Sequence, residues 1–369
     1  MRVVALDERT VGQHLVYDVV DGAGRILLPA GARITLRHVD ILRRRGYVTI
    51  PVRDPLSGHA DAEDILPSET RRRVTAEVRA GIDRAAQGAL VVTHGLRSAV
   101  GAVLDAVTRT GALTCNLHNL HAPDTFFYVH AVNVCTYALM ISTALALDPV
   151  DRRHLGIGAL LHDIGLVGCR DLLDKPEFLT PEERERMQQH PAAGFEMLRR
   201  QTEVDLRAAH CVFQHHERLD GSGYPRRLAG TDISSWGMVV AIAEAFDSMT
   251  STRVYARGRP AAAALDVLEA DAASGRLDPY LVRHFVQRVS RYPAGTIVRL
   301  GDGAVGVVAQ PDVPGHAPAR VRIVSEDGET LTDGAEPRDI QGDRPGRSVA
   351  ACLADYPEAL HPALRERAG

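Results

Sequence analysis

The chain of 369 residues carries 43 Lys and Arg against 47 Asp and Glu, which gives a formal net charge of -4 at pH 7. This length exceeds one ordinary hydrophobic core and predicts two or three domains. The small, mixed charge excludes a polyanion binder, so we expect neither a nucleic-acid polymer nor a membrane surface among the partners.

The cysteines and the N-terminus indicate a cytoplasmic protein. The five cysteines are scattered without a CxxC pair, as in chains that stay reduced inside the cell. Acidic residues follow Met1 too closely for a signal peptide, and no apolar run approaches the roughly 20 residues that span a bilayer.

Residues 1–65 predict a small α/β accessory module. Apolar and polar side chains alternate over 14–30 around Asp21-Gly22-Ala23-Gly24, which is typical of a β-hairpin. A helical pattern at 36–45 ends at a glycine and precedes a short strand at 47–52. A segment rich in Pro, Gly and Asp follows and has the composition of a linker.

The middle of the chain is helical in pattern. Residues 66–111 predict connecting helices broken near Gly88, which either act as a spacer or pair with a second copy of the chain. Residues 112–291 form a further helical domain with clear start signals. Asp148-Pro149 opens one helix, and Thr180-Pro181-Glu182-Glu183 opens another with a capping box.

The apolar period changes to two beyond Tyr292-Pro293, so residues 292–345 predict a small antiparallel β domain, followed by a tail at 346–369. Two hairpins are expected, with strands at 296–300 and 305–308 and at 320–324 and 329–332. The expected fold class is therefore mainly α, a helical bundle with a small N-terminal α/β module and a small C-terminal antiparallel β domain.

Polar side chains interrupt the apolar helical runs of the central region. They are His130, His162, Asp163, His190, His215, His216, Glu244 and Asp247. Imidazoles and carboxylates without a thiolate suit first-row divalent metals, with iron or manganese favoured and zinc, magnesium or nickel as alternatives. His215 and His216 are neighbours on a helical segment, where adjacent side chains point about 100° apart, so a shared metal ion would explain how they converge.

These residues belong to a series of spaced motifs. In chain order the motifs are His130, Leu161-His162-Asp163-Ile164-Gly165, Lys175 with Leu179-Thr180-Pro181-Glu182-Glu183, His190-Pro191 with Gly194, His215-His216-Glu217 with Asp220-Gly221-Ser222-Gly223-Tyr224-Pro225, and Phe246-Asp247 with Arg253 and Tyr255. This order resembles the HD-GYP domain, the phosphodiesterase branch of the HD metal-hydrolase superfamily. The resemblance covers about His130 to Tyr292, near half of the chain.

The resemblance implies a two-metal centre that hydrolyses cyclic di-GMP to pGpG or GMP in second-messenger signalling. It implies that Asp163 bridges the two ions and is catalytic. The coordination of one ion would be completed by His130, His162 and Glu244. The coordination of the other ion would be completed by His190, His215 and His216. A water shared by two cations about 3.5–4 Å apart is acidified and directed at phosphorus, so no side-chain nucleophile is required.

The loop after His216 is expected to position the substrate. Gly223 permits a tight loop with close backbone approach, and Tyr224-Pro225 stiffens it. Asp247 lies three residues after Glu244, on the same helical face, and is assigned a catalytic role as an acid or base in the outer shell. Arg253 is a natural clamp for a phosphate.

Four positions depart from the family pattern. Leu166 replaces the usual Lys after the HD motif and, four residues after His162, would share its helical face, so that loss of this positive charge slows turnover. Glu244 replaces the usual Asp ligand, and its extra methylene moves the carboxylate by about one bond length, which would change the metal geometry and, like Leu166, reduce activity. Phe126 replaces the acidic residue of three-metal members, which favours two ions. Ala256 replaces a basic residue near Tyr255.

Two alternatives to the phosphodiesterase of cyclic di-GMP stay open at this point. A degenerate HD-GYP domain would bind the dinucleotide or a protein partner and signal by shape. A hydrolase of another cyclic dinucleotide would keep the metal chemistry and change the substrate. The residues also leave room for a homodimer and for signalling partner proteins.

Overall fold

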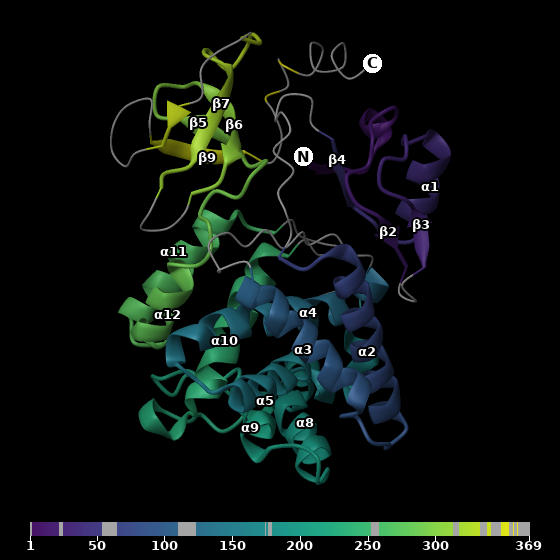
Figure 1. Ribbon diagram of the computed structural model, residues 1–369, viewed down its shortest axis with the longest axis vertical. Helices are drawn as coiled ribbons and strands as arrows, with labels where there is room; N and C mark the ends of the chain where they lie inside the picture. The colour runs from purple at the N-terminus through teal and green to yellow at the C-terminus, as the bar shows by residue number, and fades with distance from the viewer. Residues whose placement is uncertain are drawn as a thin grey trace.

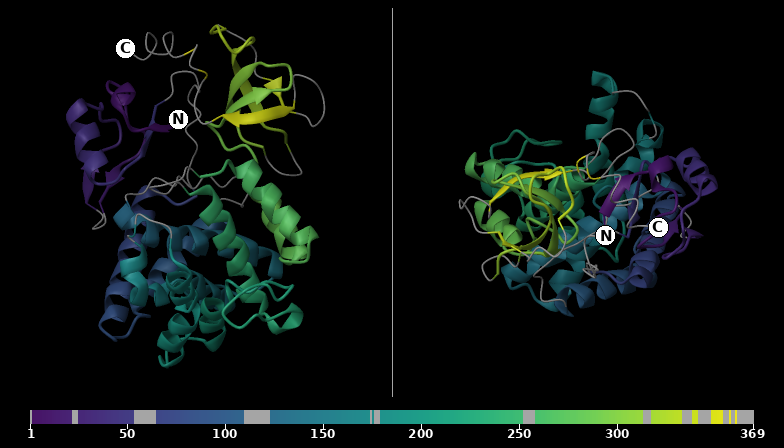
Figure 2. Two further views of the ribbon diagram at one scale, coloured as in Figure 1. Left: turned by 180° about the vertical axis from the view of Figure 1, so that it is seen from behind. Right: turned by 90° about the horizontal axis from the view of Figure 1, so that it is seen from above.

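The computed structural model places two small regions at the same end of a larger helical domain (Figure 1). The N-terminal module and the C-terminal β domain lie side by side there, and the view from behind shows the same arrangement (Figure 2). The structure describes residues 2–21, 25–53, 65–109, 123–173, 175, 179–251, 258–312, 317–332, 338–340, 348–353, 357 and 360.

The N-terminal module is a small α/β unit with its own core. Its elements are β1 (Arg2–Ala5), η1 (Glu8–Thr10), β2 (Val19–Val20), β3 (Ile26–Leu28), α1 (Leu36–Arg44) and β4 (Thr49–Val52). β1 pairs with β4, and β2 pairs with β3, both antiparallel. The hairpin predicted within 14–30 is therefore present, but its strands are short. The Asp18 carboxylate accepts the N–H of Ala30 at 2.8 Å, which directs that group away from strand pairing.

The helical domain begins with α2, directly after the buried residues Ile65 and Leu66. Its elements are α2 (Ser68–Ala86), α3 (His94–Arg109), α4 (Pro123–Ser142), η2 (Thr143–Leu145), α5 (Pro149–Leu160), η3 (Ile164–Cys169), α6 (Arg170–Leu173), α7 (Pro181–Gln188), α8 (His190–Arg199), α9 (Leu206–Gln214), η4 (Gly230–Asp232), α10 (Ser235–Thr250), α11 (Ala261–Ala273) and α12 (Pro279–Val286). Among the described residues, no helix combines the length and apolar character needed to cross a bilayer.

One hydrophobic core runs through this whole domain. Val78 of α2 and Val100 of α3 are fully buried in the same cluster as Leu139 of α4 and Leu160 of α5. The two helices predicted as connectors are therefore part of the helical domain itself. They pack on α4 and α5, the helices that carry or precede several of the expected metal ligands.

Helix starts follow the predicted capping signals. The Asp148 carboxylate accepts the N–H groups of Val150 and Asp151, both at 2.8 Å, and opens α5. Thr180 and Glu183 form the predicted capping box at α7. Such caps satisfy N–H groups that the first helical turn leaves without partners, so these boundaries are readable from local sequence.

The C-terminal β domain is a five-stranded antiparallel sheet in the order β8-β7-β6-β5-β9. Its strands are β5 (Ile297–Leu300), β6 (Val305–Gln310), β7 (Arg320–Ser325), β8 (Arg338–Asp339) and β9 (Val349–Leu353). β5 and β6 form the first predicted hairpin. β9 pairs with β5 and so extends the sheet into the range assigned to a tail.

The second predicted hairpin is wrong. β7 pairs with β6 and β8, and residues 329–332 form no strand. The Asp327 carboxylate accepts the N–H groups of Glu329 and Thr330 at 2.8 and 2.9 Å, as well as the Thr330 hydroxyl. These bonds use the donors that a strand would need, and they form a local turn instead.

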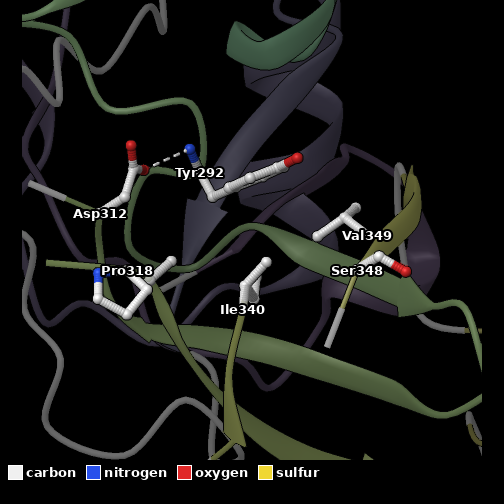
Figure 3. A pocket seen from close by; sticks show the side chains of 7 residues that line it. Tyr292, Asp312, Pro318, Ile340, Ser348 and Val349 are labelled. Atoms are coloured by element: carbon white, nitrogen blue, oxygen red, sulfur yellow. Dashed lines mark hydrogen bonds between the residues drawn. The ribbon is translucent and has the colours of Figure 1, made fainter. Parts of the chain in front are cut away.

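A cavity of about 340 Å³ lies in the C-terminal β domain (Figure 3). Its lining residues are Tyr292, Asp312, Pro318, Ala319, Ile340, Ser348 and Val349. The Asp312 carboxylate accepts the N–H groups of Arg291 and Tyr292 at 3.2 and 3.0 Å and also the Ser290 hydroxyl. Asp312 therefore links the end of β6 to the segment that follows α12.

Candidate metal centre

Asp163 lies in the short connection between α5 and η3. α5 ends at Leu160, and Leu161 has φ -111° and ψ 11°, outside the helical range. Asp163 then precedes the 3-10 helix η3. Because the α-helix stops before His162, the expectation that His162 and Leu166 share one helical face is wrong. The break releases the side chains of His162 and Asp163 from the helix surface and directs both into the domain interior.

The Asp163 carboxylate is the centre of a cluster of imidazoles. Its Oδ1 lies 3.1 Å from Nε2 of His190 and 3.5 Å from Nε2 of His215. Its Oδ2 lies 3.2 Å from Nε2 of His162 and 3.8 Å from Nε2 of His130. The two carboxylate oxygens thus face two different pairs of histidines. These side chains come from α4, the α5–η3 connection, α8 and the end of α9.

The same cluster contains two groups of potential metal ligands that share Asp163. One group is His130, His162 and Asp163, and the other is Asp163, His190, His215 and His216, with the ligand atoms of each group within 4.8 Å of one another. The structure therefore brings together six of the expected ligands. Their division into two groups follows from the two oxygens of one carboxylate.

Backbone carbonyls determine which nitrogen each imidazole presents. Nδ1 of His162 lies 2.9 Å from the carbonyl of Ala159, Nδ1 of His190 lies 2.7 Å from that of Met187, and Nδ1 of His215 lies 2.8 Å from that of Val212. A carbonyl oxygen only accepts, so each Nδ1 must carry the hydrogen. In its neutral form, each ring presents the lone pair of Nε2 to Asp163, which is the arrangement that metal-binding histidines require.

This arrangement fits a bound cation. In the absence of a cation or an added proton, the Nε2 atoms and the Asp163 oxygens are hydrogen-bond acceptors that face one another. Nε2 of His162 is buried without a hydrogen-bond partner, although a carboxylate oxygen lies 3.2 Å away. Nε2 of His190 and Nε2 of His215 lie 3.2 Å apart. Lone pairs that face each other in a buried site repel unless a proton or a cation lies between them, and a divalent cation would satisfy all of these atoms together.

The electrostatics of the cluster also favour positive charge. Burial alone raises the pKa of Asp163, but the charge of a protonated His162 and hydrogen bonds with His162, His190 and His215 hold that pKa well below its usual range. Burial lowers the pKa of His162, and the Asp163 carboxylate more than reverses this effect. The buried carboxylate is therefore ionised, and without a metal ion the positive charge beside it is the proton on His162.

His215 and His216 remain neutral at pH 7. Burial lowers the pKa of His215 to about 4, and burial followed by the charges of His215 and His190 lowers the pKa of His216 well below its ordinary value. A neutral imidazole is the form that coordinates a metal, so no proton has to leave these two rings before coordination.

Asp247 supports the cluster from behind His130. Its Oδ2 lies 2.6 Å from Nδ1 of His130 and accepts the Ser251 hydroxyl at 3.1 Å, while its Oδ1 accepts the Asn133 amide N–H at 2.9 Å. Asp247 is fully buried, and both oxygens are occupied. Its carboxylate therefore orients the imidazole of His130, and the acid or base role expected for Asp247 stays a prediction.

The structure shows the surroundings of two residues that depart from the family pattern. Glu244 lies on α10 and accepts the Ser248 hydroxyl at 2.9 Å, and its carboxylate is not among the ligand atoms that gather around Asp163. Leu166 is 7% exposed and packs in an apolar cluster with Cys169 and Leu172. That cluster, rather than a face open to a phosphate, surrounds the position where the family has Lys.

Phe126 stands on α4 one turn before His130. The two rings are nearly parallel, with an interplanar angle of 8° and centroids 5.6 Å apart. An aromatic ring thus covers the flank of His130 where an acidic side chain would offer a further ligand. Arg253, the expected phosphate clamp, and Ala256 lie outside the described residues.

The loop that follows His216 is held against the cluster by a buried carboxylate. Glu217 is 2% exposed, and its two oxygens accept the N–H groups of Arg226 at 2.8 Å and Leu228 at 2.9 Å. Gly223 lies so close to this turn that a Cβ there would come within 2.5 Å of the His216 carbonyl. Tyr224 then stacks on His216, with ring centroids 4.5 Å apart and an angle of 23°.

Burial raises the pKa of Tyr224, so its phenol stays protonated and can donate a hydrogen bond. Pro225 follows it in the same turn. The ring of Tyr224 therefore lies beside the rings of His190 and His216.

Sequence reasoning missed the supporting residues of this site. Glu217 follows the two histidines directly, but an acidic residue in a polar loop normally lies in solvent, so its burial leaves no sequence signal. Asn133 lies three residues after His130 in an apolar helix, where a polar side chain could have been flagged as buried. Gly165 and Gly194 were included in motifs, but their role in close packing emerges only from their contact across η3 and α8.

Comparison with known proteins agrees with this geometry. Residues 115–281 match the family model described as the HD domain. Residues 115–281 of the helical domain are an HD domain, and α2 and α3 lie outside the matched residues. The family predicted from the spaced motifs is thereby confirmed, and the HD domain contains all six ligands that the structure gathers around Asp163.

Several curated relatives of the HD domain are phosphodiesterases of cyclic dinucleotides. A cyclic di-GMP phosphodiesterase of Pseudomonas aeruginosa is 34% identical over 270 residues, which cover 71% of this chain and 64% of that protein. A cyclic di-GMP phosphodiesterase of Thermotoga maritima is 40% identical over 40% of each chain. A 3'3'-cGAMP-specific phosphodiesterase of Vibrio cholerae is 36% identical over 38% of this chain and 30% of that protein. The matched region thus spans between about a third and two thirds of these relatives.

Proposed function

We propose that this protein is a metal-dependent phosphodiesterase that hydrolyses cyclic di-GMP to pGpG, GMP or both. The observation that carries this proposal is the Asp163 carboxylate, whose two oxygens face two separate groups of histidine Nε2 atoms. The relatives named above act on cyclic dinucleotides, which supports the same substrate class for this HD domain.

In this proposal, His130 and His162 hold one divalent ion with Asp163, and His190, His215 and His216 hold the other. The donor set contains nitrogen and carboxylate oxygen without thiolate, which favours iron or manganese. Two such ions, when bound, lower the pKa of a shared water towards neutrality and withdraw charge from the phosphoryl oxygens. Glu244 is proposed as a further ligand of the His130 ion, in exchange for its bond with Ser248.

The chain itself supplies orientation and substrate contacts. The carbonyls behind His162, His190 and His215 keep the hydrogen on Nδ1, so that Nε2 stays available for the ions. Asp247 does the same for His130 and acts as a positioning residue. We propose that Gly223, Tyr224 and Pro225 form the wall against which the dinucleotide lies, and that Arg253 contacts a phosphate.

The direct test is turnover of cyclic di-GMP by purified protein loaded with manganese or iron, with the metal content measured in the same samples. We expect hydrolysis with about two ions per chain, and loss of activity by at least about 100-fold in Asp163→Asn and His162→Ala. His284→Ala, on α12 outside the cluster, serves as the histidine control. A wild-type rate equal to that of the two site variants, with both ions bound, would refute the proposal.

Measurements on the same samples also distinguish two alternative functions. A protein that binds cyclic di-GMP without hydrolysing it would be a sensor, which Leu166 in place of Lys favours. A protein that hydrolyses 3'3'-cGAMP faster than cyclic di-GMP would share its substrate with the Vibrio relative. A substrate panel, combined with size measurement for a homodimer, resolves these readings.

A further inference from the structure

A chain of hydrogen bonds connects α2 to the metal-facing imidazole of His130. Nη1 of Arg71 donates to Oδ1 of Asn133 at 2.9 Å, and Nδ2 of Asn133 donates to Oδ1 of Asp247 at 2.9 Å. Oδ2 of Asp247 then lies 2.6 Å from Nδ1 of His130. We propose that Arg71 is a positioning residue for the metal centre and that it acts through Asn133 and Asp247.

The direction of this relay follows from its end groups. A guanidinium can only donate, and an ionised carboxylate can only accept. The Asn133 amide between them has one favourable orientation, with its carbonyl towards Arg71 and its N–H towards Asp247. The reversed amide would oppose two donors at one end and two acceptors at the other. Arg71 therefore sets the orientation of the Asn133 amide, and that amide sets the orientation of the Asp247 carboxylate. The carboxylate in turn keeps the hydrogen of His130 on Nδ1.

Burial makes each link of the relay matter. Asn133 and Asp247 are 0% exposed and His130 is 4% exposed, so water cannot replace a lost partner at these atoms. In such a site, hydrogen bonds are electrostatically stronger than in water, and a cation at one end polarises the bonds that follow. The loss of Arg71 would leave the Asn133 carbonyl without this donor and would loosen the orientation of Asp247.

Arg71 comes from outside the part of the chain that contains the ligands. It lies in the first turn of α2, where its N–H bonds to the carbonyl of Pro67 at 2.9 Å. The preceding residues Ile65 and Leu66 are buried in the same core as α4. The relay thus makes the start of α2, the first helix after the N-terminal module, part of the support of His130.

This inference rests on the proposed metal centre, and its test uses Mn²⁺ binding together with a measurement that needs no metal. In Arg71→Ala, we expect the affinity for the ion on the His130 side to fall about 10-fold, the lower end of the range for outer-shell residues. The second ion and KM should stay unchanged. Arg71→Lys should restore most of the affinity, and Arg72→Ala, an exposed neighbour on the same helix, should match the wild type.

The metal-free measurement is the ¹⁵N spectrum of the histidine imidazoles. We expect His130 to show the Nδ1–H form in the wild type and a mixture of both forms in Arg71→Ala. This result decides the question even if the chain binds no Mn²⁺, in which case the metal-centre proposal fails separately. In a double-mutant cycle, Arg71→Ala should add no further loss of Mn²⁺ affinity in an Asn133→Ala background, because Arg71 acts through that amide.

Three outcomes would overturn the inference. The first is an unchanged His130 spectrum and unchanged Mn²⁺ affinity in Arg71→Ala. The second is an equal loss of both ions that Arg71→Lys fails to restore, as a purely structural defect would give. The third is full additivity of the Arg71→Ala and Asn133→Ala effects on Mn²⁺ affinity.

Discussion

Substitution of Gly165 by Ala should separate the two halves of the metal centre. A Cβ at Gly165 would lie 2.0 Å from the carbonyl oxygen of His190 and 2.7 Å from the N–H nitrogen of Gly194. Both neighbours are backbone atoms of α8, so no flexible side chain can move aside. An ordinary carbon–oxygen contact needs about 3.2 Å, and η3 and α8 would therefore have to separate by about 1.2 Å.

This separation acts directly on the ligands, because Asp163 precedes η3 and His190 begins α8. Nε2 of His190 now lies 3.1 Å from Oδ1 of Asp163, and an added displacement of about 1 Å would cost about 100-fold in activity. Forcing an extra methyl group into a packed interior also costs about 1–3 kcal/mol of stability. Gly165→Ala should therefore lose affinity for the ion on the His190 side and unfold at a lower urea concentration.

The assay is Mn²⁺ titration, urea unfolding and cyclic di-GMP turnover on two matched variants. Gly168 lies in the same 3-10 helix, and a Cβ there meets nothing within 4 Å, so Gly168→Ala is the control. We expect Gly168→Ala to behave as the wild type in all three measurements. If Gly165→Ala also keeps wild-type metal affinity and stability, the close packing of η3 on α8 does not position His190 as argued.

Three other measurements follow from the described contacts. Glu217→Gln should lose about 1–3 kcal/mol of stability and raise KM, while its Mn²⁺ affinity stays unchanged. The cause is that the amide NH₂ of the glutamine would face one of the two backbone N–H donors that the carboxylate now accepts. A variant with wild-type unfolding and wild-type KM would contradict this prediction. The metal-free protein should lose stability, measured by urea unfolding, as the pH falls from 6.5 towards 4. In this range His215 of the unfolded chain takes up a proton, whereas His215 of the folded chain, with a pKa of about 4, does not. His215→Ala should flatten this part of the stability profile, and an equally steep slope in that variant would contradict the prediction. Leu166→Lys should lower the melting temperature rather than raise turnover, because an ammonium group would enter the apolar cluster with Cys169 and Leu172. Leu166→Met is the control. A stable Leu166→Lys variant with faster turnover would show instead that position 166 is open to the phosphate of the substrate.

The sequence alone determined the features that local chemistry controls. Helix starts at Pro149 and Pro181 follow from caps within a few residues of each boundary, and the first C-terminal hairpin follows from a period of two around a glycine turn. The candidate ligands could be named because imidazoles and carboxylates in apolar helical runs are costly unless they have partners. Those partners did not need to be known for the pattern to be visible.

Only the tertiary structure decided how these residues act on one another. The place of Leu166 depends on where α5 stops and a 3-10 helix begins, which no helical periodicity shows. The burial of Glu217 and the link from Arg71 to His130 depend on contacts between segments distant in the chain. Such contacts arise from the packing of whole helices, so the residues that hold the ligands in place carry no local signal, whereas the ligands themselves do.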